Sequence, residues 1–297
     1  VWSDEFDSGV TKTNPNPNDW ERQIMAGSQS GNNEWEYYTD RMDNSWLENG
    51  NLVIEAKKEA YKGYNYTSAK LATNVGWTYG YFEARAKVPK GEGFWPAIWM
   101  LPVASRYGPW PGEGEIDIME SVNSESTFPY ACQTIHYGGY LMEGGSKKED
   151  SQQAPKNNCF SMGDWDDYHT WGVDWSPEAI TFYVDGKQTV SVPGTSWYSW
   201  DYPKNVHYPA PAPFDEQFHW ILNFAIAGNW PGFKVDDSKL PAQLIIDYVR
   251  VYQQFRMGLC FCFSCSSSFL LLGNADSFGQ PISLVLDRSK TTTPGHR

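Results

Sequence analysis

The sequence predicts an all-β protein, built as an antiparallel sandwich or barrel, and three observations support this. Short apolar stretches, many of them alternating with polar residues, recur from the N-terminus to about residue 254. Turn-forming Gly, Pro, Asn and Asp separate these stretches, and long helical periodicity is scarce. Regular short strands between turn signals are typical of antiparallel sandwiches and barrels.

The strand signals follow one another in a regular series. Asp185-Gly186 marks a tight hairpin between two of them. The apolar run 94–101 is short and has prolines nearby, so we expect a buried strand there and not a helix. The predicted strands are 51–56, 80–88, 94–101, 114–121, 131–137, 169–174, 179–184, 188–192, 220–226 and 244–252. The long segments expected to be loops are 10–32, 102–113 and 138–164. Loops of this length either rim a binding site or are disordered.

Length and composition limit the class of protein. A chain of 297 residues is long enough for one large domain with a sizeable core or for two small domains. A net charge of −13 without a basic patch argues against nucleic acid and anionic membranes as partners. The 15 Trp and 18 Tyr are more than a core needs. Their flat rings suit sugar faces, with core packing as the competing interpretation.

Composition also divides the chain into two parts. Residues 1–254 are expected to form the domain, because every Trp and Tyr precedes residue 255. Residues 257–273 are uncharged and rich in Cys, Ser, Phe and Leu. Serines interrupt this apolar run, which barely reaches the ~18 residues of a membrane-spanning helix. We therefore expect 255–297 to be a disordered or non-native tail rather than a membrane anchor.

Two features bear on the cellular compartment. The chain begins without a charged-then-apolar signal segment, and Asn65-Tyr66-Thr67 matches the N-glycosylation pattern. We therefore expect an extracellular protein whose signal segment is not in this chain. Cys132 and Cys159 either form a disulfide or are buried thiols. The spacing of Cys260, Cys262 and Cys265 does not match a zinc site.

The stretch 114–121 carries the chemistry of this sequence. It places Glu115, Asp117 and Glu120 within six residues, separated by apolar side chains. Alternation on a strand puts Glu115 and Asp117 on one face but sends Glu120 to the other. A β-bulge around Ile118 and Met119 would return Glu120 to the face of the other two acids. The sequence therefore predicts a bulged strand with three carboxyl groups on one side.

Three acids on one face suit a particular reaction. Like charges raise the pKa of one carboxyl group and leave another ionised, which supplies a proton donor and a nucleophile. Hydrolysis of a glycosidic bond needs this pairing. An exposed acidic edge strand is the competing interpretation of the same residues.

This strand resembles the signature of glycoside hydrolase family 16, in its laminarinase-like branch of endo-β-1,3-glucanases. Other motifs resemble that branch in the same order, and the similarity covers about residues 1–253. These motifs are Trp2-Ser3-Asp4-Glu5-Phe6, Glu34-Trp35-Glu36-Tyr37-Tyr38-Thr39, Asn49-Gly50-Asn51-Leu52-Val53-Ile54, Thr67-Ser68-Ala69-Lys70-Leu71, Trp95-Pro96-Ala97-Ile98-Trp99-Met100, Thr134-Ile135-His136-Tyr137-Gly138 and Asp247-Tyr248-Val249-Arg250-Val251-Tyr252.

The resemblance implies a β-jelly-roll sandwich of two curved antiparallel sheets with a substrate groove on the concave face. It implies retaining endo-hydrolysis of β-1,3-glucan, with Glu115 as nucleophile and Glu120 as general acid and then base. Asp117 would lie between them and hydrogen-bond the nucleophile. The extra residue, Met119, matches the bulged form, which favours laminarin-type substrates; mixed-linkage β-1,3-1,4-glucan is a further candidate.

The resemblance also implies a set of substrate contacts. These residues are Asn33, Arg85, Trp95, Trp99, Trp110 and His136. For Trp95 and Trp99, which lie in the apolar run 94–101, core packing is the alternative interpretation. For His136, the alternative is a structural role. Arg85 has a surface ion pair as its alternative, and Asn33 a turn position. The prolines on both sides of Trp110 favour a binding role in a loop.

The resemblance also leads to predictions about metal ions, cofactors and partners. The family often carries a structural calcium, and Glu5, Gly50 and Asp247 resemble that site, although ordinary strand ends are the alternative. Catalysis needs no cofactor. We expect a polysaccharide substrate, a monomer and no membrane association. The rival functions are a non-catalytic β-glucan-binding module, which typically lacks one of the two glutamates, and a family 16 hydrolase for agar or carrageenan.

Overall fold

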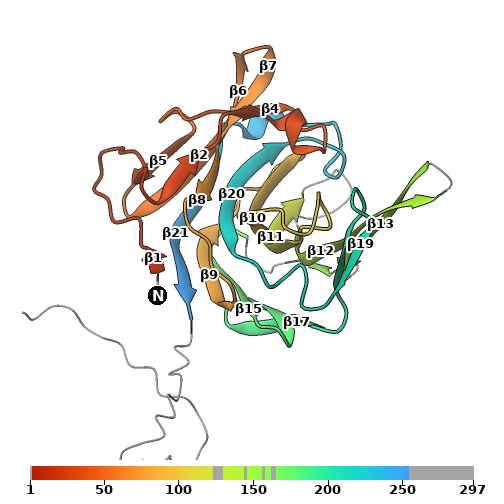
Figure 1. Ribbon diagram of the computed structural model, residues 1–297. Coiled ribbons are helices and arrows are strands. Elements are labelled where there is room, and N and C mark those ends of the chain that lie inside the picture. Colours follow the sequence, from red (N-terminus) through yellow and green to blue (C-terminus); the bar gives the residue numbers. More distant parts are fainter. Residues whose placement is uncertain (1, 123–129, 144–145, 156–157, 162–164, 254–297) are drawn as a thin grey trace, which may run out of the picture. The chain divides into compact units, whose positions relative to one another are not determined.

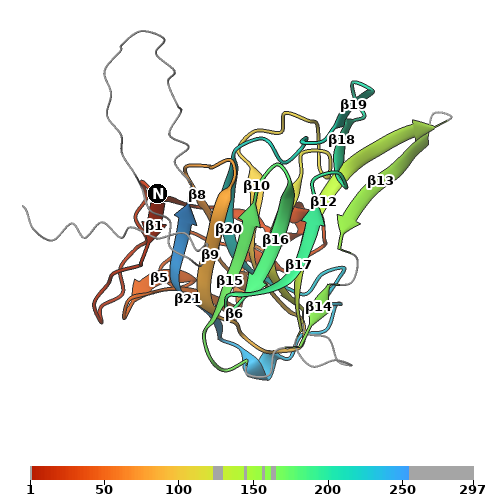
Figure 2. The same ribbon diagram turned by 90° about the horizontal axis from the view of Figure 1, so that it is seen from below.

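Two β-sheets packed face to face form the described part of the chain (Figures 1 and 2). The computed structural model describes residues 2–122, 130–143, 146–155, 158–161 and 165–253. The predicted tail 255–297 lies outside these residues, so the domain boundary stays a prediction. No helix in the described ranges is long and apolar enough to span a membrane.

The eleven-stranded sheet has the order β17 (Lys187–Pro193), β16 (Ala179–Val184), β15 (His169–Trp175), β9 (Gly80–Lys87), β21 (Ala242–Tyr252), β6 (Asn51–Tyr61), β7 (Tyr64–Ser68), β4 (Glu36–Tyr38) and β3 (Met25–Ala26), with β1 (Trp2–Asp4) on β21 and β5 (Ser45–Glu48) on β6. The ten-stranded sheet has the order β19 (Val206–Pro209), β18 (Tyr198–Asp201), β12 (Tyr130–Glu143), β11 (Glu115–Val122), β10 (Phe94–Pro102), β20 (Phe218–Ile226), β8 (Lys70–Thr73) and β2 (Trp20–Arg22), with β13 (Ser146–Ala154) and β14 (Cys159–Phe160) on β12. Two short 3₁₀ helices, η1 (Gly27–Ser30) and η2 (Asp237–Lys239), lie between strands.

The predicted all-β sandwich is confirmed, with one refinement of its topology. Most neighbouring strands are antiparallel, as expected, but β4 pairs with β7 and β12 pairs with β18 in parallel. These pairs join segments that are distant in sequence. Neither could be inferred from turn signals, which reveal only hairpins between consecutive strands.

Alternation of buried and exposed side chains explains why the sheets pack. On β9, Phe82, Ala84 and Ala86 are fully buried, while the residues between them are partly exposed. Trp171 from β15 and Trp220 from β20 are also fully buried in the core between the sheets. Burial of a large apolar side chain contributes roughly 1.5–3 kcal/mol relative to exposure. Most of the predicted strands appear here because their alternation matches this two-layer burial.

The expectation of a loop over 138–164 is wrong for residues 138–143, 146–154 and 159–160, which belong to strands. β12 continues to Glu143 and pairs with β13 through nine register partners, from Ile135 with Ala154 to Glu143 with Ser146. The resulting hairpin extends away from the sandwich (Figure 1). Gly138-Gly139 and the charged residues of β13 resemble a loop in sequence, but cross-strand hydrogen bonds fix them as strands.

The structure decides between the two interpretations of Cys132 and Cys159: they form a disulfide. Cys132 on β12 lies opposite Cys159 on β14. Since β14 has only two residues, its ladder with β12 is short. The disulfide therefore supplies a covalent attachment for a weakly paired strand.

We expect the double substitution Cys132→Ser/Cys159→Ser to lower the free energy of unfolding by about 3 kcal/mol, because a loop closed by a disulfide restricts the unfolded chain. Guanidinium denaturation of the parent and the variant measures this difference. The parent treated with a reductant is the matched control and should behave like the variant. Equal denaturation midpoints for oxidised parent and variant would contradict the expectation.

Candidate functional site

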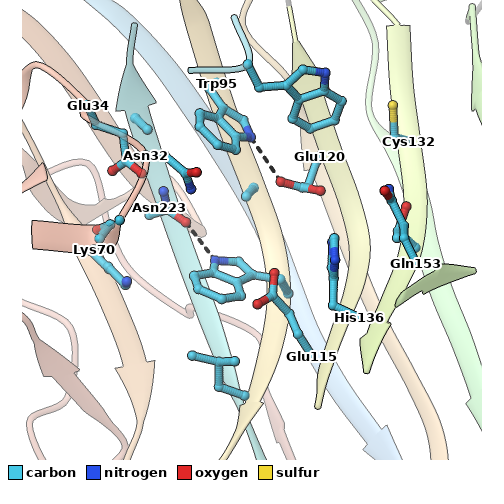
Figure 3. A pocket seen from close by; sticks show the side chains of 18 of the residues that line it. Asn32, Glu34, Lys70, Trp95, Glu115, Glu120, Cys132, His136, Gln153 and Asn223 are labelled. Atoms are coloured by element: carbon cyan, nitrogen blue, oxygen red, sulfur yellow. Dashed lines mark hydrogen bonds between the residues drawn. The ribbon is translucent and has the colours of Figure 1, made fainter. Parts of the chain in front are cut away.

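A groove of about 1100 Å³ crosses the face of the ten-stranded sheet that points away from the core. Its floor is built by residues of β8, β20, β10, β11 and β12, which are neighbours in that order in the sheet. In Figure 3, Glu115 and Glu120 lie in the middle of this groove. Glu34 and Lys70 lie on one side of them, and Cys132 and Gln153 on the other. The two glutamates therefore sit where a long ligand would pass.

The bulge predicted in β11 is present. Asp117 lies opposite Thr134 and Glu120 opposite Cys132, so β11 has one more residue than β12 over this interval. Ile118 and Met119 both point into the core and are fully buried. Glu120 consequently returns to the groove side, together with Glu115.

Each of the two groove glutamates accepts a hydrogen bond from an indole N–H. Trp110 Nε1 donates to Glu115 Oε2 at 2.6 Å, and Trp95 Nε1 donates to Glu120 Oε1 at 3.0 Å. The rings restrict each carboxyl group to one orientation while leaving it on the groove wall. This arrangement holds two acids at fixed positions along one strand.

Burial and neighbouring charges shift the pKa of carboxyl groups in this site. Burial raises the pKa of Glu120 well above its usual range, and the charges of Asp117 and Glu115 raise it further. The hydrogen bond from Trp95 acts in the opposite direction, as does His136 when its ring is protonated. Glu120 therefore holds a proton at a pH where an ordinary glutamate has lost it, as a proton donor requires.

Asp117 lies beneath the two glutamates and is almost completely buried. Burial raises its pKa well above the usual range, and the charge of Glu115 adds to this effect. His136 Nε2 approaches Asp117 Oδ2 at 3.3 Å, from the strand position opposite Glu115. The raised pKa of Asp117 favours its neutral form, and a neutral Asp117 beside Glu115 limits the repulsion among the three acids.

Lys70, on one side of the acids, was missed as a candidate by the sequence analysis. Lys70 is buried in β8, and its Nζ lies 4.9 Å from the centre of the Trp99 ring. Burial lowers the pKa of Lys70, whereas the charges of Glu34, Glu115 and Glu36 raise it. The signal was present in the sequence, since a single lysine stands in the otherwise apolar stretch Ala69-Lys70-Leu71-Ala72.

A hydrogen-bonded chain of side chains continues behind Trp99. Trp99 Nε1 donates to Asn223 Oδ1 at 2.7 Å, and Asn223 Nδ2 donates to the Tyr38 hydroxyl at 3.0 Å. Burial raises the pKa of Glu34 and, more strongly, that of Glu36 beside it. Four distant segments of the chain, around β4, β8, β10 and β20, meet in this network, so its members could not be identified from local patterns.

The other side of the acids is formed by β12, β13 and β14. Cys132 and Cys159 line the groove together with Gln153 and Phe160. Cys132 is the direct register partner of Glu120, so the disulfide lies one strand away from the Glu120 carboxyl group. No local pattern in the sequence places this cysteine pair in the groove, because the two strands that carry it meet only in the folded sheet.

Most of the predicted substrate contacts are brought together. Trp95, Trp99, Trp110 and His136 all line the groove beside the acids. Asn33 lies next to the groove in a second, smaller pocket, where its Nδ2 donates to Asn229 Oδ1 at 2.9 Å. Its backbone has a positive φ of 56°, as the turn alternative for this residue suggests.

Arg85 does not lie with the other predicted contacts. It belongs to β9 in the eleven-stranded sheet, where its Nη1 is 2.6 Å from Asp247 Oδ2 and its guanidinium covers the Tyr168 ring. The prediction that Arg85 contacts the substrate therefore disagrees with its position. The surface ion pair, its alternative, is what the structure shows, and the cation in the groove is Lys70.

The three residues proposed for calcium lie near one another at strand ends. Asp4 pairs with Val249 and Leu52 with Ile246, which brings Glu5 and Gly50 close to Asp247. Arg250 donates to both carboxylate oxygens of Glu5, at 2.7 and 3.0 Å, and Arg85 binds Asp247. As placed, both carboxylates are neutralised by arginines, so calcium binding would have to use backbone oxygens or displace an ion pair. Calcium stays a prediction.

A different cluster is spaced closely enough to share a metal ion. Among the described residues, Glu115, Asp117 and His136 bring one ligand atom each to within 4.8 Å of one another. His136 Nε2 lies 3.3 Å from Asp117 Oδ2, and the charge of Glu115 raises the pKa of Asp117, so these groups already interact with one another as placed. The sequence prediction for the two acids of this cluster is acid–base and nucleophilic chemistry, not metal binding.

Comparison with known proteins places this geometry in context. The model of the family described as "Glycosyl hydrolases family 16" matches residues 30–210. A β-glucanase of Rhodothermus marinus is 40% identical over 267 residues, covering 85% of this chain and 84% of the relative. The crystal structure of the laminarinase from the same organism superposes with a TM-score of 0.67 at 38% identity, covering 85% of this chain and 96% of that one. The structure of SCLam, titled a non-specific endo-β-1,3(4)-glucanase, gives a TM-score of 0.66 at 35% identity, with 85% and 90% coverage.

The environment of Glu120 leads to a prediction about its titration. We expect its pKa to lie above the ordinary 4.5 and to rise further in Trp95→Phe, because the lost indole N–H stabilises the charged form. Carbon NMR of labelled glutamate side chains over a pH series measures both values, and Glu120→Gln identifies the signal. A midpoint at or below 4.5 in the parent, or a lower one in Trp95→Phe, would contradict this.

Proposed function

The chain belongs to glycosyl hydrolase family 16, and we propose that it hydrolyses β-1,3-glucosidic linkages within laminarin-type β-glucans. The single observation that carries this proposal is the bulged strand β11, which places Glu115 and Glu120 together on the groove side. A non-catalytic glucan-binding module needs no such pair. The relatives described above are named for activity on β-glucans, which supports the substrate class.

The open shape of the site supports endo-hydrolysis. The groove continues on both sides of the acids, from Lys70 to Gln153, so a polymer can pass through and be cut internally (Figure 3). Trp95, Trp99 and Trp110 offer flat apolar surfaces for sugar rings around the point of cleavage. Mixed β-1,3-1,4-glucans are a secondary substrate in this proposal, because an open groove tolerates a locally different linkage.

We propose a double displacement with retention at the anomeric carbon. Glu120 donates its proton to the glycosidic oxygen while Glu115 attacks the anomeric carbon and forms a glycosyl-enzyme. Water then enters, Glu120 removes its proton, and the bond to Glu115 breaks. Asp117 lies beside Glu115 throughout and provides a neutral neighbour as the charge on Glu115 changes.

The proposal also includes the cellular compartment, the oligomeric state and a structural metal ion. The Cys132–Cys159 disulfide supports an extracellular protein, since disulfides persist in oxidising compartments. A monomer suffices, because residues of one chain supply both acids and the walls around them. Structural calcium near Glu5, Gly50 and Asp247 is a further part of this proposal.

We expect Glu115→Gln to lower kcat on laminarin by a factor on the order of 10⁴ or more, because the amide cannot act as the nucleophile. Release of reducing sugar measures the rate. Glu178→Gln, a matched change at an exposed residue before β16, is the control and should keep the parent rate. Turnover of Glu115→Gln near the parent rate would remove the nucleophile assignment.

For Glu120→Ala, the loss should depend on the leaving group. Laminarin hydrolysis should fall by about 10²–10⁴-fold, whereas formation of the glycosyl-enzyme from an aryl β-glucoside with an activated leaving group needs no proton and should lose much less. Rates of aryl release across leaving groups of increasing pKa measure the trend. An equal loss for every leaving group would argue against the proton-donor role.

A further inference from the structure

A second pocket, of about 530 Å³, lies directly beside the groove. It lies between η1, the residues that precede β4, and the tight turn joining β6 to β7. Glu34 lines both the groove and this pocket, so the two spaces meet at that residue. The volume falls within the range of about 300–1000 Å³ that is usual for small-molecule sites.

Aromatic rings dominate one wall of this pocket. Trp35 is 37% exposed, and its ring lies nearly parallel to that of Tyr66, with 6.3 Å between centroids and 15° between planes. Phe233 packs against Trp35 at 5.8 Å from another side, and Tyr64 adds a further ring to the wall. These contacts fix Trp35 in position, which lowers the entropic cost of stacking a ligand on it.

Polar groups that could bind sugar hydroxyls lie beside these rings. Within the described residues, neither the Trp35 indole N–H nor the Asn65 side-chain amide makes a hydrogen bond, and Asn65 is exposed. The Ser28 and Tyr64 hydroxyls lie 3.1 Å apart and hydrogen-bond each other. A pocket with stacking rings and hydroxyl-binding groups suits a sugar ring, which has apolar faces and a polar edge.

The charge of the pocket selects a neutral ligand. Glu34 is the charged residue among those that line it, and burial raises the pKa of its carboxyl group. No lysine or arginine lines the described pocket, so nothing there would neutralise a sulfated or phosphorylated ligand. The lining therefore fits an uncharged glucose unit better than an anionic sugar.

We propose that this pocket is an outlying glucose-binding site that holds the same β-glucan chain after it leaves the groove past Lys70 and Glu34. This inference rests on the proposed hydrolysis of β-1,3-glucan. Trp35 stacks on a sugar of the polymer, and Asn65 hydrogen-bonds its hydroxyl groups. Only substrates long enough to extend from the acids beyond Glu34 reach the pocket, so it makes the enzyme favour long chains.

The test uses KM for β-1,3-gluco-oligosaccharides of increasing length. The protein is made in bacteria, so that the Asn65-Tyr66-Thr67 sequence carries no glycan that would fill the pocket. We expect Trp35→Ala to raise KM for long chains by about 3–10-fold relative to its effect on short ones, the range for one stacking contact. Asn65→Ala, which leaves the packed rings intact, should change the same ratio in the same direction but by less.

Tyr252→Ala is the matched control, because Tyr252 is a 47% exposed aromatic residue that lines neither pocket. Thermal unfolding confirms that each variant is folded. If the parent cleaves no oligosaccharide of any length, the proposed function itself fails. If the parent cleaves them and its KM–length curve coincides with those of Trp35→Ala and Asn65→Ala, the function stands and the outlying site is overturned.

Discussion

One extra residue in β11 is the constraint on which the site depends. An unbulged strand would turn Glu120 into the core and leave Met119 on the groove side, because side chains on a strand alternate between faces. The bulge costs little free energy of folding because Ile118 and Met119 are both apolar and both pack in the core. A polar residue at either position would leave an unsatisfied group between the sheets. The pair of glutamates and the packing of the sandwich are therefore two results of the same backbone irregularity.

Burial then gives the three acids their separate roles. In water, their carboxyl groups would all be ionised at neutral pH. At the floor of the groove, desolvation and mutual repulsion raise the pKa of Glu120 and of Asp117. Trp95 and Trp110 donate N–H groups that hold Glu120 and Glu115 in place. The tryptophans that orient the two carboxyl groups are thus the same residues that we propose as surfaces for sugar rings.

The flanks of the groove come from separate parts of the fold. On one side, Lys70 contacts Trp99, and Asn223 links Trp99 to the buried Tyr38. On the other side, the Cys132–Cys159 disulfide ties β14 to the strand that neighbours Glu120. In the proposed function, long substrates would contact both flanks, whereas the chemistry itself needs only the centre. Under that proposal, specificity for chain length is located away from the two glutamates.

The sequence by itself determined that the fold is all-β and that three acids share one strand, because both follow from local patterns. Alternation reveals which face of a strand is buried, and one extra residue in the strand is what brings Glu120 to the face of Glu115 and Asp117. The choice of a sandwich over a barrel came from the family resemblance, and the structure confirmed both the sandwich and the bulge. Only the tertiary structure decided that Lys70, and not Arg85, lies in the groove, and that Cys132 joins Cys159 beside Glu120. The physical reason is that β8 and β9 belong to different sheets, and the pairing of distant strands depends on the packing of the whole core rather than on neighbouring residues.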